Sequence, residues 1–263
     1  MAAFDAAILP GTKLVSLSHV LWTTGARLPV DQIAAIAHER GALVAIDGAQ
    51  AVGAIPVSVE ETGADFYAVA GEKWLLGPEG TGALWVAPAA VERAATSNVG
   101  HFSFESIGLD GVARLHPNAR RFEASNHHRP SIVALARSCG WLSMYVGLPW
   151  IHARGTALAR ATAERLAGIP GVELITPRER MANLVTFRIG GWSADAALDE
   201  LGSRVFAIAR TVPSLDAIRI SVGFFTTEPE LERFAGAVEL LAAHTPQSLP
   251  PRSRLTILGQ DDG

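Results

Sequence analysis

Short, continuous apolar runs are the feature that most constrains the fold of this chain. "ALVAI" at 42–46, "DFYAVA" at 65–70 and "GALWVA" at 82–87 lack the polar alternation of a strand with one wet face. Runs of this kind are typical of strands buried on both faces, as in parallel sheets covered by helices. Before the first run, "VDQIAAIAHER" carries apolar residues at helical spacing. Strands that alternate with helices predict an α/β fold with a mostly parallel sheet.

The second half of the chain repeats strand-like and helical segments on a smaller scale. We expect strands at "VELIT", "NLVTFRI", "RVFAIAR" and "AIRISVG", and helices near 193–202 and 228–243. The sequence therefore predicts a larger domain over 1–149, a smaller C-terminal α+β domain over 150–245 and a flexible tail over 246–263. Between about 95 and 130 we expect a long irregular segment, which in a compact domain is usually functional or contacts a partner.

Composition excludes several classes of protein. The formal net charge of −4 and pI near 6.1 argue against a nucleic-acid-binding protein. Apolar runs of the roughly 20 residues that span a bilayer are missing, which argues against a membrane protein. The N-terminus lacks the features of a signal peptide, and a single cysteine, Cys139, fits a reducing compartment, so we expect a cytoplasmic protein.

Lysine is rare in this sequence. The chain has 22 basic residues, and only Lys13 and Lys73 are lysines. Lys73 lies in the apolar stretch "AVAGEKWLLGPEGTGALWV". A lysine amine can lose its proton and form a Schiff base, whereas an arginine guanidinium cannot. Lys73 is therefore a candidate nucleophile in apolar surroundings; the alternative is a lysine that extends from a strand end into water.

Asp47 and Gln50 follow the buried run "ALVAI", where parallel sheets bind ligands at the carboxyl ends of their strands. A carboxylate at that position needs a cation or hydrogen-bond donors. A pyridinium nitrogen is one such cation, and pairing with it keeps pyridoxal phosphate an effective electron sink. Asp47 could instead cap the following turn, and Gln50 alone is a weak signal.

Taken together, these motifs resemble the class V aminotransferase family of pyridoxal-phosphate enzymes. The resemblance rests on "AIDGAQAVGAIPV", on "GADFYAVAGEKWLLGPEGTGALWV" with Lys73 following Asp47, and on "SHVLWTTGARLPV", "RRFEASNHHRP" and "IRISVGFFTTEPELERF". This family has the type I fold of pyridoxal-phosphate enzymes and includes cysteine desulfurases, cystine lyases and isopenicillin N epimerase. The resemblance implies part of the large cofactor-binding domain and a smaller C-terminal domain, with the chain beginning within the large domain.

The resemblance also implies roles for individual residues. Lys73 would form the aldimine with the cofactor, Asp47 would pair with the pyridine nitrogen, Gln50 would contact the phenolic oxygen and His19 would lie near the ring. Asn126, with Ser125, takes the place of a Gly-Thr pair that reaches the cofactor phosphate of the neighbouring subunit. In the final motif, Arg219 would bind the substrate carboxylate, which suits a planar guanidinium, and Arg210 is a second candidate. The family also implies a homodimer.

The chain departs from the family pattern in two places. Glu72 stands where most relatives have a histidine, and a carboxylate there would repel the cofactor phosphate unless it points away. Cys139 lies in a helical stretch, and "IARTVPSLDAIRIS" lacks the cysteine that desulfurases carry before the carboxylate-binding arginine. His127 and His128 have no partner ligands at metal spacing, so we expect no metal site.

From these residues we expect a pyridoxal-phosphate-dependent enzyme that acts on a small amino-acid substrate. Transamination, cleavage of the carbon–sulfur bond of cysteine or cystine, and epimerisation remain open as reactions. A hypothesis of another class is a fragment without cofactor that serves as a dimerisation module.

Overall fold

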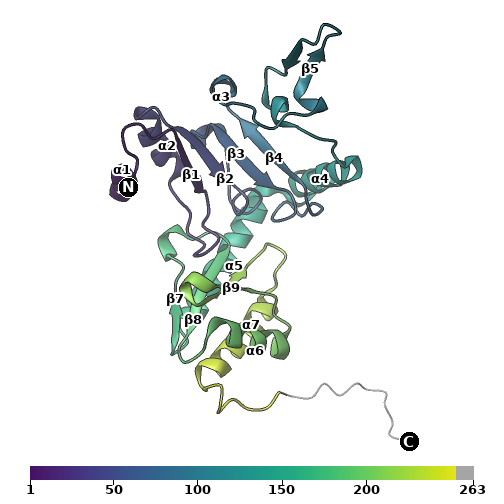
Figure 1. Cartoon of the computed structure of the whole chain (residues 1–263). Coiled ribbons are helices and arrows are strands. Elements are labelled where there is room, and N and C mark those ends of the chain that lie inside the picture. Colours follow the sequence, from purple (N-terminus) through teal and green to yellow (C-terminus); the bar gives the residue numbers. More distant parts are fainter. Residues whose placement is uncertain (253–263) are drawn as a thin grey trace, which may run out of the picture. The chain divides into compact units, whose positions relative to one another are not determined.

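The computed structural model describes residues 1–252, which form two compact units (Figure 1). One unit consists of Met1–Trp22 and Ala26–Arg154, and the other consists of Thr23–Gly25 and the chain from Gly155 onward. Helix α5 (Leu148–Ala167) crosses the division between the two units. It also crosses the domain boundary expected between residues 149 and 150, and that boundary stays a prediction. Of the tail expected at 246–263, residues 253–263 lie outside the described part of the chain.

The first unit is built on a four-stranded sheet in the order β1-β2-β3-β4, namely Leu14–Ser18, Leu43–Asp47, Phe66–Ala70 and Gly82–Val86. Strands β1, β2 and β3 are parallel, and β4 is antiparallel to β3. Residues 71–81 join β3 to β4 without a helix, as is common between antiparallel neighbours. The α/β fold with a mostly parallel sheet is therefore confirmed, with one antiparallel strand at its edge.

Helix α2 (Val30–Glu39) covers this sheet because its apolar residues fall on one stripe. Val30, Ile33, Ala34 and Ala37 are buried in the same cluster as Val44 and Ile46 of β2 and Tyr67 of β3. Gly41, with φ +76°, turns the chain from α2 into β2. Other helical elements of this unit are α1 (Ala2–Ala7), η1 (Glu60–Thr62), α3 (Pro88–Arg93), α4 (Arg129–Trp141) and the π-helix η4 (Leu142–Val146).

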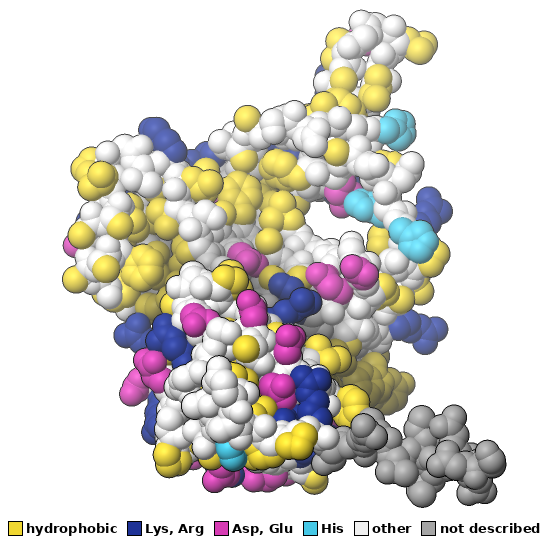
Figure 2. All heavy atoms as spheres, turned by 60° about the horizontal axis from the view of Figure 1, so that its bottom comes forward, with side chains coloured by type: hydrophobic (Ala, Val, Ile, Leu, Met, Phe, Trp, Pro, Cys, Tyr) yellow, Lys and Arg dark blue, Asp and Glu magenta, His cyan; other side chains and the backbone are white. Residues whose placement is uncertain are grey.

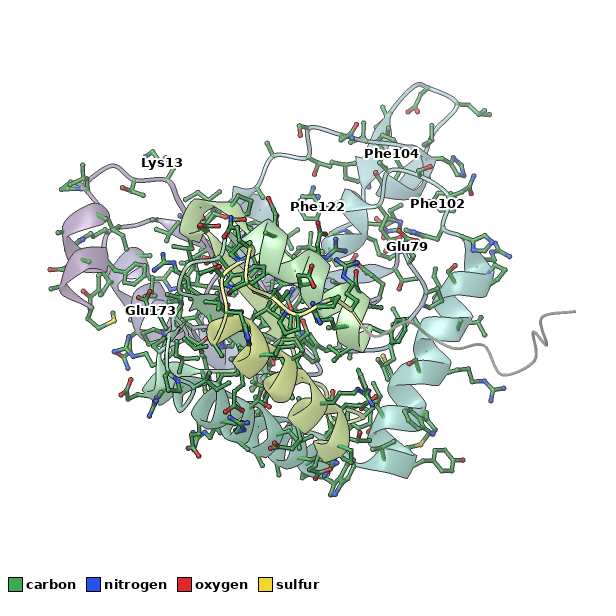
Figure 3. All side chains as sticks on the ribbon, turned by 90° about the horizontal axis from the view of Figure 1, so that it is seen from below. Lys13, Glu79, Phe102, Phe104, Phe122 and Glu173 are labelled. Atoms are coloured by element: carbon green, nitrogen blue, oxygen red, sulfur yellow. The ribbon has the colours of Figure 1, made fainter. Side chains whose placement is uncertain are left out.

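The segment expected to be irregular, from about 95 to 130, contains an antiparallel hairpin. Strands β5 (Phe104–Ile107) and β6 (Ala113–Leu115) pair around a turn in which Gly111 has φ +80° and Asp110 accepts a hydrogen bond from the Val112 backbone N–H. Short helices η2 (His101–Ser103) and η3 (Ala119–Phe122) flank it. Phe122, labelled in Figure 3, packs edge-to-face on Phe66 of β3 and so attaches the segment to the sheet. The expectation of an irregular segment is therefore wrong for residues 104–115, where a turn that contains Gly111 allows two strands to pair.

The second unit has an antiparallel sheet in the order β7-β8-β10-β9, namely Val172–Leu174, Leu184–Ile189, Ala217–Ser221 and Arg210–Val212. Helices α6 (Ala194–Val205) and α7 (Glu228–Ala242) share its buried core with α5, and η5 (Arg178–Arg180) and η6 (Pro213–Leu215) lie in the connections. The strand expected at "RVFAIAR" is wrong for most of its length. Helix α6 continues to Val205, Phe206 ends it with φ +56°, and β9 begins only at Arg210.

The surface carries charges of both signs. Figure 2 shows basic and acidic side chains interspersed on the face that it presents. Exposed apolar residues of the hairpin include Ile107, Leu109 and Val112. Within residues 1–252 no single helix is long and apolar enough to cross a membrane; residues 129–146 and 148–167 meet that test of length and composition only together, across a bend of 85°.

Candidate active site

The carboxyl ends of the parallel strands β1, β2 and β3 lie at one edge of the sheet, where His19 follows β1 and Asp47 ends β2. In the strand register Ser18 lies opposite Asp47, and Asp47 lies opposite Ala68. Beyond the strands, the His19 backbone N–H donates to the Asp47 carbonyl oxygen (2.9 Å), and the Gly48 N–H donates to the Ala68 carbonyl oxygen (2.8 Å). Asp47 therefore ends a strand whose neighbours on both sides are tied to it.

The Asp47 side chain is exposed and oriented by local hydrogen bonds. Its Oδ1 accepts from the Ala49 backbone N–H (2.9 Å), and its Oδ2 lies 3.4 Å from the Ser18 hydroxyl oxygen. The Gly48 carbonyl oxygen then accepts from the N–H groups of Ala51 and Val52, which forms the turn that carries Gln50. The predicted capping role of Asp47 and a role toward a cation are thus compatible, because a carboxylate offers about four acceptor positions.

Gln50 is joined to the lysine loop by a side-chain hydrogen bond. The indole Nε1–H of Trp74 donates to Gln50 Oε1 (2.9 Å). Because an indole N–H can only donate, the amide oxygen of Gln50 must face it, which leaves the amide NH₂ of Gln50 as a donor toward other groups. This orientation suits a donor to an oxygen such as a phenolate.

Lys73 lies in a loop that is closed by backbone hydrogen bonds. The Gly71 N–H donates to Thr81 O and the Gly77 N–H to Gly71 O, both at 2.8 Å, while the Leu76 N–H donates to the Lys73 carbonyl oxygen at 3.0 Å. The Ser138 hydroxyl of α4 donates to Leu75 O (2.6 Å) and fixes the middle of the loop.

The Lys73 side chain is exposed, as is that of Glu72. The apolar surroundings expected for Lys73 are therefore wrong, since β3 ends at Ala70 and the lysine follows in the loop. In this respect Lys73 matches the alternative of a lysine that extends from a strand end into water.

His19 is buried and bonded to Tyr67, a residue that the sequence analysis did not single out. His19 Nδ1 lies 2.8 Å from the Tyr67 hydroxyl oxygen, and the two rings meet edge to face. The pKa of His19 is lowered to about 4, mainly by burial and also by the positive charge of Arg27, while the negative charge of Asp31 opposes this. Burial also raises the pKa of Tyr67, with the negative charge of Asp47 acting in the same direction and Arg27 opposing. Both groups are neutral at neutral pH.

Asn126 lies in the connection between η3 and α4, where its side chain is exposed. Its role toward a cofactor phosphate stays a prediction. Nearby, His127 Nε2 lies 3.3 Å from Glu123 Oε2. In the described part of the chain, His, Cys, Asp and Glu side chains form no group of three or more that could hold a metal ion.

Arg219 and Arg210 are direct cross-strand neighbours in the second unit. They lie opposite each other on β10 and β9, with Thr186 of β8 opposite Arg219 on its other side. Arg219 is half-buried and Arg210 is exposed. Burial lowers the pKa of Arg219, and the positive charge of Arg210 lowers it further. Like charges directly opposite in a sheet are destabilising, and a bound anion would relieve them.

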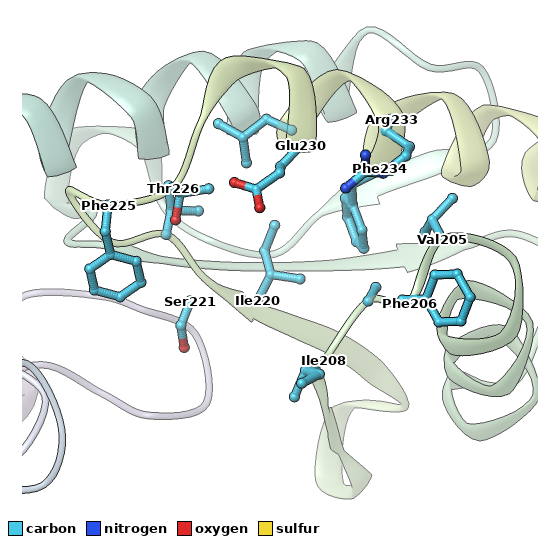
Figure 4. A pocket seen from close by; sticks show the side chains of 13 residues that line it. Val205, Phe206, Ile208, Ile220, Ser221, Phe225, Thr226, Glu230, Arg233 and Phe234 are labelled. Carbon is cyan, nitrogen blue, oxygen red and sulfur yellow. The ribbon is translucent and has the colours of Figure 1, made fainter. Parts of the chain in front are cut away.

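The second unit also contains a cavity of about 420 Å³ (Figure 4). Apolar side chains such as Phe206, Ile220 and Phe234 line it, together with the charged Glu230 and Arg233. None of the site residues predicted from the sequence lies among its lining residues.

Comparison with known proteins decides the family. The sequence profile of the family described as Aminotransferase class-V matches residues 1–234. The chain belongs to the class V aminotransferase family.

Curated members of this family with similar sequences include enzymes with different names. A probable cysteine desulfurase of Mycolicibacterium paratuberculosis is 32% identical over 92% of this chain and 36% of its own length. The isopenicillin N epimerase of Streptomyces clavuligerus is 33% identical over 91% of this chain and 63% of its own length. The chain therefore spans less than two thirds of the length of these relatives.

Solved structures of class V members share this fold. The apo structure of a cysteine desulfurase from Thermococcus onnurineus NA1 has a TM-score of 0.80 and 27% identity, and covers 92% of this chain and 62% of its own. The cystine C–S lyase C-DES, solved with its reaction product cysteine persulfide, has a TM-score of 0.83 and 25% identity, with 90% and 64% covered. The prediction of a partial class V fold is confirmed.

Gly48, Tyr67 and Trp74 were not predicted as site residues from the sequence. Tyr67 lies in a buried apolar run, where a tyrosine hydroxyl needs a polar partner. Gly48 directly follows the strand that carries Asp47, a place where a glycine can mark close packing. These two signals could have directed attention to the contact between them.

Proposed function

We propose that this chain is part of a pyridoxal-phosphate-dependent enzyme that acts on an amino acid, with Lys73 as the residue that bonds to the cofactor. The observation that carries the proposal is that Asp47 ends β2, Gln50 follows it, and Lys73 follows the parallel neighbour β3, so all three lie at the carboxyl ends of these strands. The Trp74–Gln50 hydrogen bond supports it further, since it links the turn after β2 to the lysine loop after β3.

The residues present fit this cofactor. Asp47 is an exposed carboxylate that can accept a hydrogen bond from a pyridinium N–H, and Gln50 has an amide NH₂ to donate to the phenolic oxygen. Lys73 offers an exposed primary amine, which can condense with an aldehyde. When bound, pyridoxal phosphate would supply an electron sink for negative charge that develops at the substrate Cα.

The chain's own residues would then divide the work. The Asp47 carboxylate would favour the protonated ring nitrogen by its charge. The Lys73 amine would take a proton from the substrate Cα or return one. In the second unit, Arg219 would bind the substrate carboxylate through its planar guanidinium, with Arg210 as a second candidate.

Cleavage of a carbon–sulfur bond is a second candidate within the same chemistry. The sequence contains one cysteine, Cys139, which lies in α4 and not in the connection between β9 and β10. A desulfurase reaction through a cysteine near Arg219 is therefore disfavoured, and lyase or epimerase chemistry fits better. Two incubations distinguish the lyase from a transaminase. Pyruvate and sulfide formed from cysteine indicate the lyase, whereas amino-group transfer from alanine to a keto acid indicates transamination.

The decisive test uses the two lysines of the chain. Pyridoxal phosphate added to the purified protein should give a visible absorbance band. Borohydride reduction should add to the peptide that contains Lys73 the mass of the cofactor, less one water lost on condensation and plus two hydrogens. Lys73→Ala should abolish both signals. Lys13→Ala is the matched control, since Lys13 precedes β1 at its amino end (Figure 3) and should leave both unchanged. A parent protein that gives neither signal would instead support the alternative of a fragment without cofactor.

A further inference from the structure

The backbone after Asp47 passes against an aromatic ring. Gly48 is buried, and a Cβ atom built on it would lie 2.0 Å from Cε1 of Tyr67 and 2.7 Å from its hydroxyl oxygen. The ring of Tyr67 thus occupies the space that a side chain at 48 would need. Because Gly48 is one bond from Asp47, the position of this ring limits where the end of β2 can lie.

The Tyr67 ring is itself held by His19. Tyr67 has no exposed surface and His19 is 3% exposed, and the 2.8 Å hydrogen bond between them is the contact that satisfies the tyrosine hydroxyl. The backbone N–H of His19 donates to the Asp47 carbonyl oxygen. His19 therefore constrains Asp47 in two ways. Its backbone N–H bonds directly to Asp47, and its side chain holds the Tyr67 ring, which packs against Gly48.

The pair holds this position without a net charge of its own. The charged groups that act on it are Arg27, Asp31 and Asp47, and burial outweighs them for both members. A neutral pair adds no charge beside the Asp47 carboxylate, so its effect on Asp47 is one of position.

We propose that Tyr67 and His19 are positioning residues for Asp47, which fix the strand end so that its carboxylate meets the ring nitrogen of pyridoxal phosphate. This inference rests on the proposed function. It assigns His19 a place behind Asp47, in addition to the place near the ring that the family resemblance implies.

The test is a comparison of two ligands by equilibrium dialysis. One is pyridoxal phosphate, and the other is its 1-deaza analogue, in which a CH group replaces the ring nitrogen. Tyr67→Phe keeps the ring against Gly48 and removes the hydroxyl that bonds to His19. Asp47 should then meet the ring nitrogen less well, and we expect the Kd for pyridoxal phosphate to rise about tenfold, the size of effect typical of one lost hydrogen bond. The analogue has no ring nitrogen, so its Kd should stay within about twofold.

The outcomes separate this inference from the proposed function. An equal rise of both Kd values, or no rise in either, overturns the positioning role while the proposed function stands. A wild-type protein that binds no pyridoxal phosphate overturns both. Tyr145→Phe is the matched control, because Tyr145 is 80% exposed and its loss should change neither Kd.

A second pair of variants keeps the inference testable if Tyr67→Phe does not fold. His19→Asn retains an amide near the position of Nδ1 and should keep the preference for pyridoxal phosphate over the analogue, whereas His19→Ala should lose it. Loss of the preference in both variants, or in neither, overturns the positioning role.

Discussion

The buried His19 makes the stability of the first unit depend on pH in a defined window. Burial lowers the pKa of His19 from the ordinary 6.5 to about 4. Between these values the unfolded chain binds a proton that the folded chain does not, so acid favours unfolding and stability falls as the pH falls from 6.5 to 4. Each pKa unit corresponds to about 1.4 kcal/mol, so the whole effect is about 3 kcal/mol. About 2 kcal/mol of this should be lost between pH 7 and pH 5.

The measurement is urea unfolding of the wild type and of His19→Asn at pH 7 and at pH 5. Asparagine does not titrate, so the variant should lose about 2 kcal/mol less than the wild type over this range. His152, whose pKa burial also lowers, is present in both proteins and drops out of the difference. His101→Asn removes an exposed histidine and should behave as the wild type.

Parallel loss of stability in the wild type and His19→Asn would refute the reasoning that burial keeps His19 neutral. A larger loss in the variant would show that the protonated histidine stabilises the fold, which is the opposite sign.

Two further predictions concern the site residues. Gly48→Ala should lower the free energy of unfolding by about 2 kcal/mol, because the new Cβ meets the Tyr67 ring, and Gly236→Ala, which has open space, should not; urea unfolding measures both. Arg219→Lys should raise KM for the amino-acid substrate about tenfold through loss of the planar guanidinium, and Arg210→Lys should raise it less because Arg210 is exposed. Equal effects on KM would contradict the assignment of Arg219 as the main carboxylate ligand.

The sequence predicts the strands that carry the site well, because their signals are local. Short, continuous apolar runs predicted β2 and β3. Because these strands are parallel, their carboxyl ends lie at the same edge of the sheet, and so do the polar residues that follow them. The direction of β4 could not be read from "GALWVA", since the same run suits a parallel or an antiparallel neighbour. The pairing seen in the structure decides it.

The remaining features depend on contacts between distant residues. The exposure of Lys73 follows from where β3 stops, and the hydrogen bond between Tyr67 of β3 and His19, which follows β1, joins residues far apart in the sequence. Neither leaves a periodic pattern in the sequence. The end of α6 was missed for a related reason, because the apolar residues of "RVFAIAR" suit a strand as well as the last turn of a helix.

Strands β2 and β3 occupy the interior of the four-stranded sheet, with β1 and β4 as its edges in the described part of the chain. A sheet can gain strands only at an edge, so any polypeptide that extended it would add beyond β1 or β4. Such growth would leave the register of Ser18, Asp47 and Ala68 as it is. The pairing of β2 with β3, which positions Asp47 and Lys73, therefore does not depend on the number of strands in the sheet.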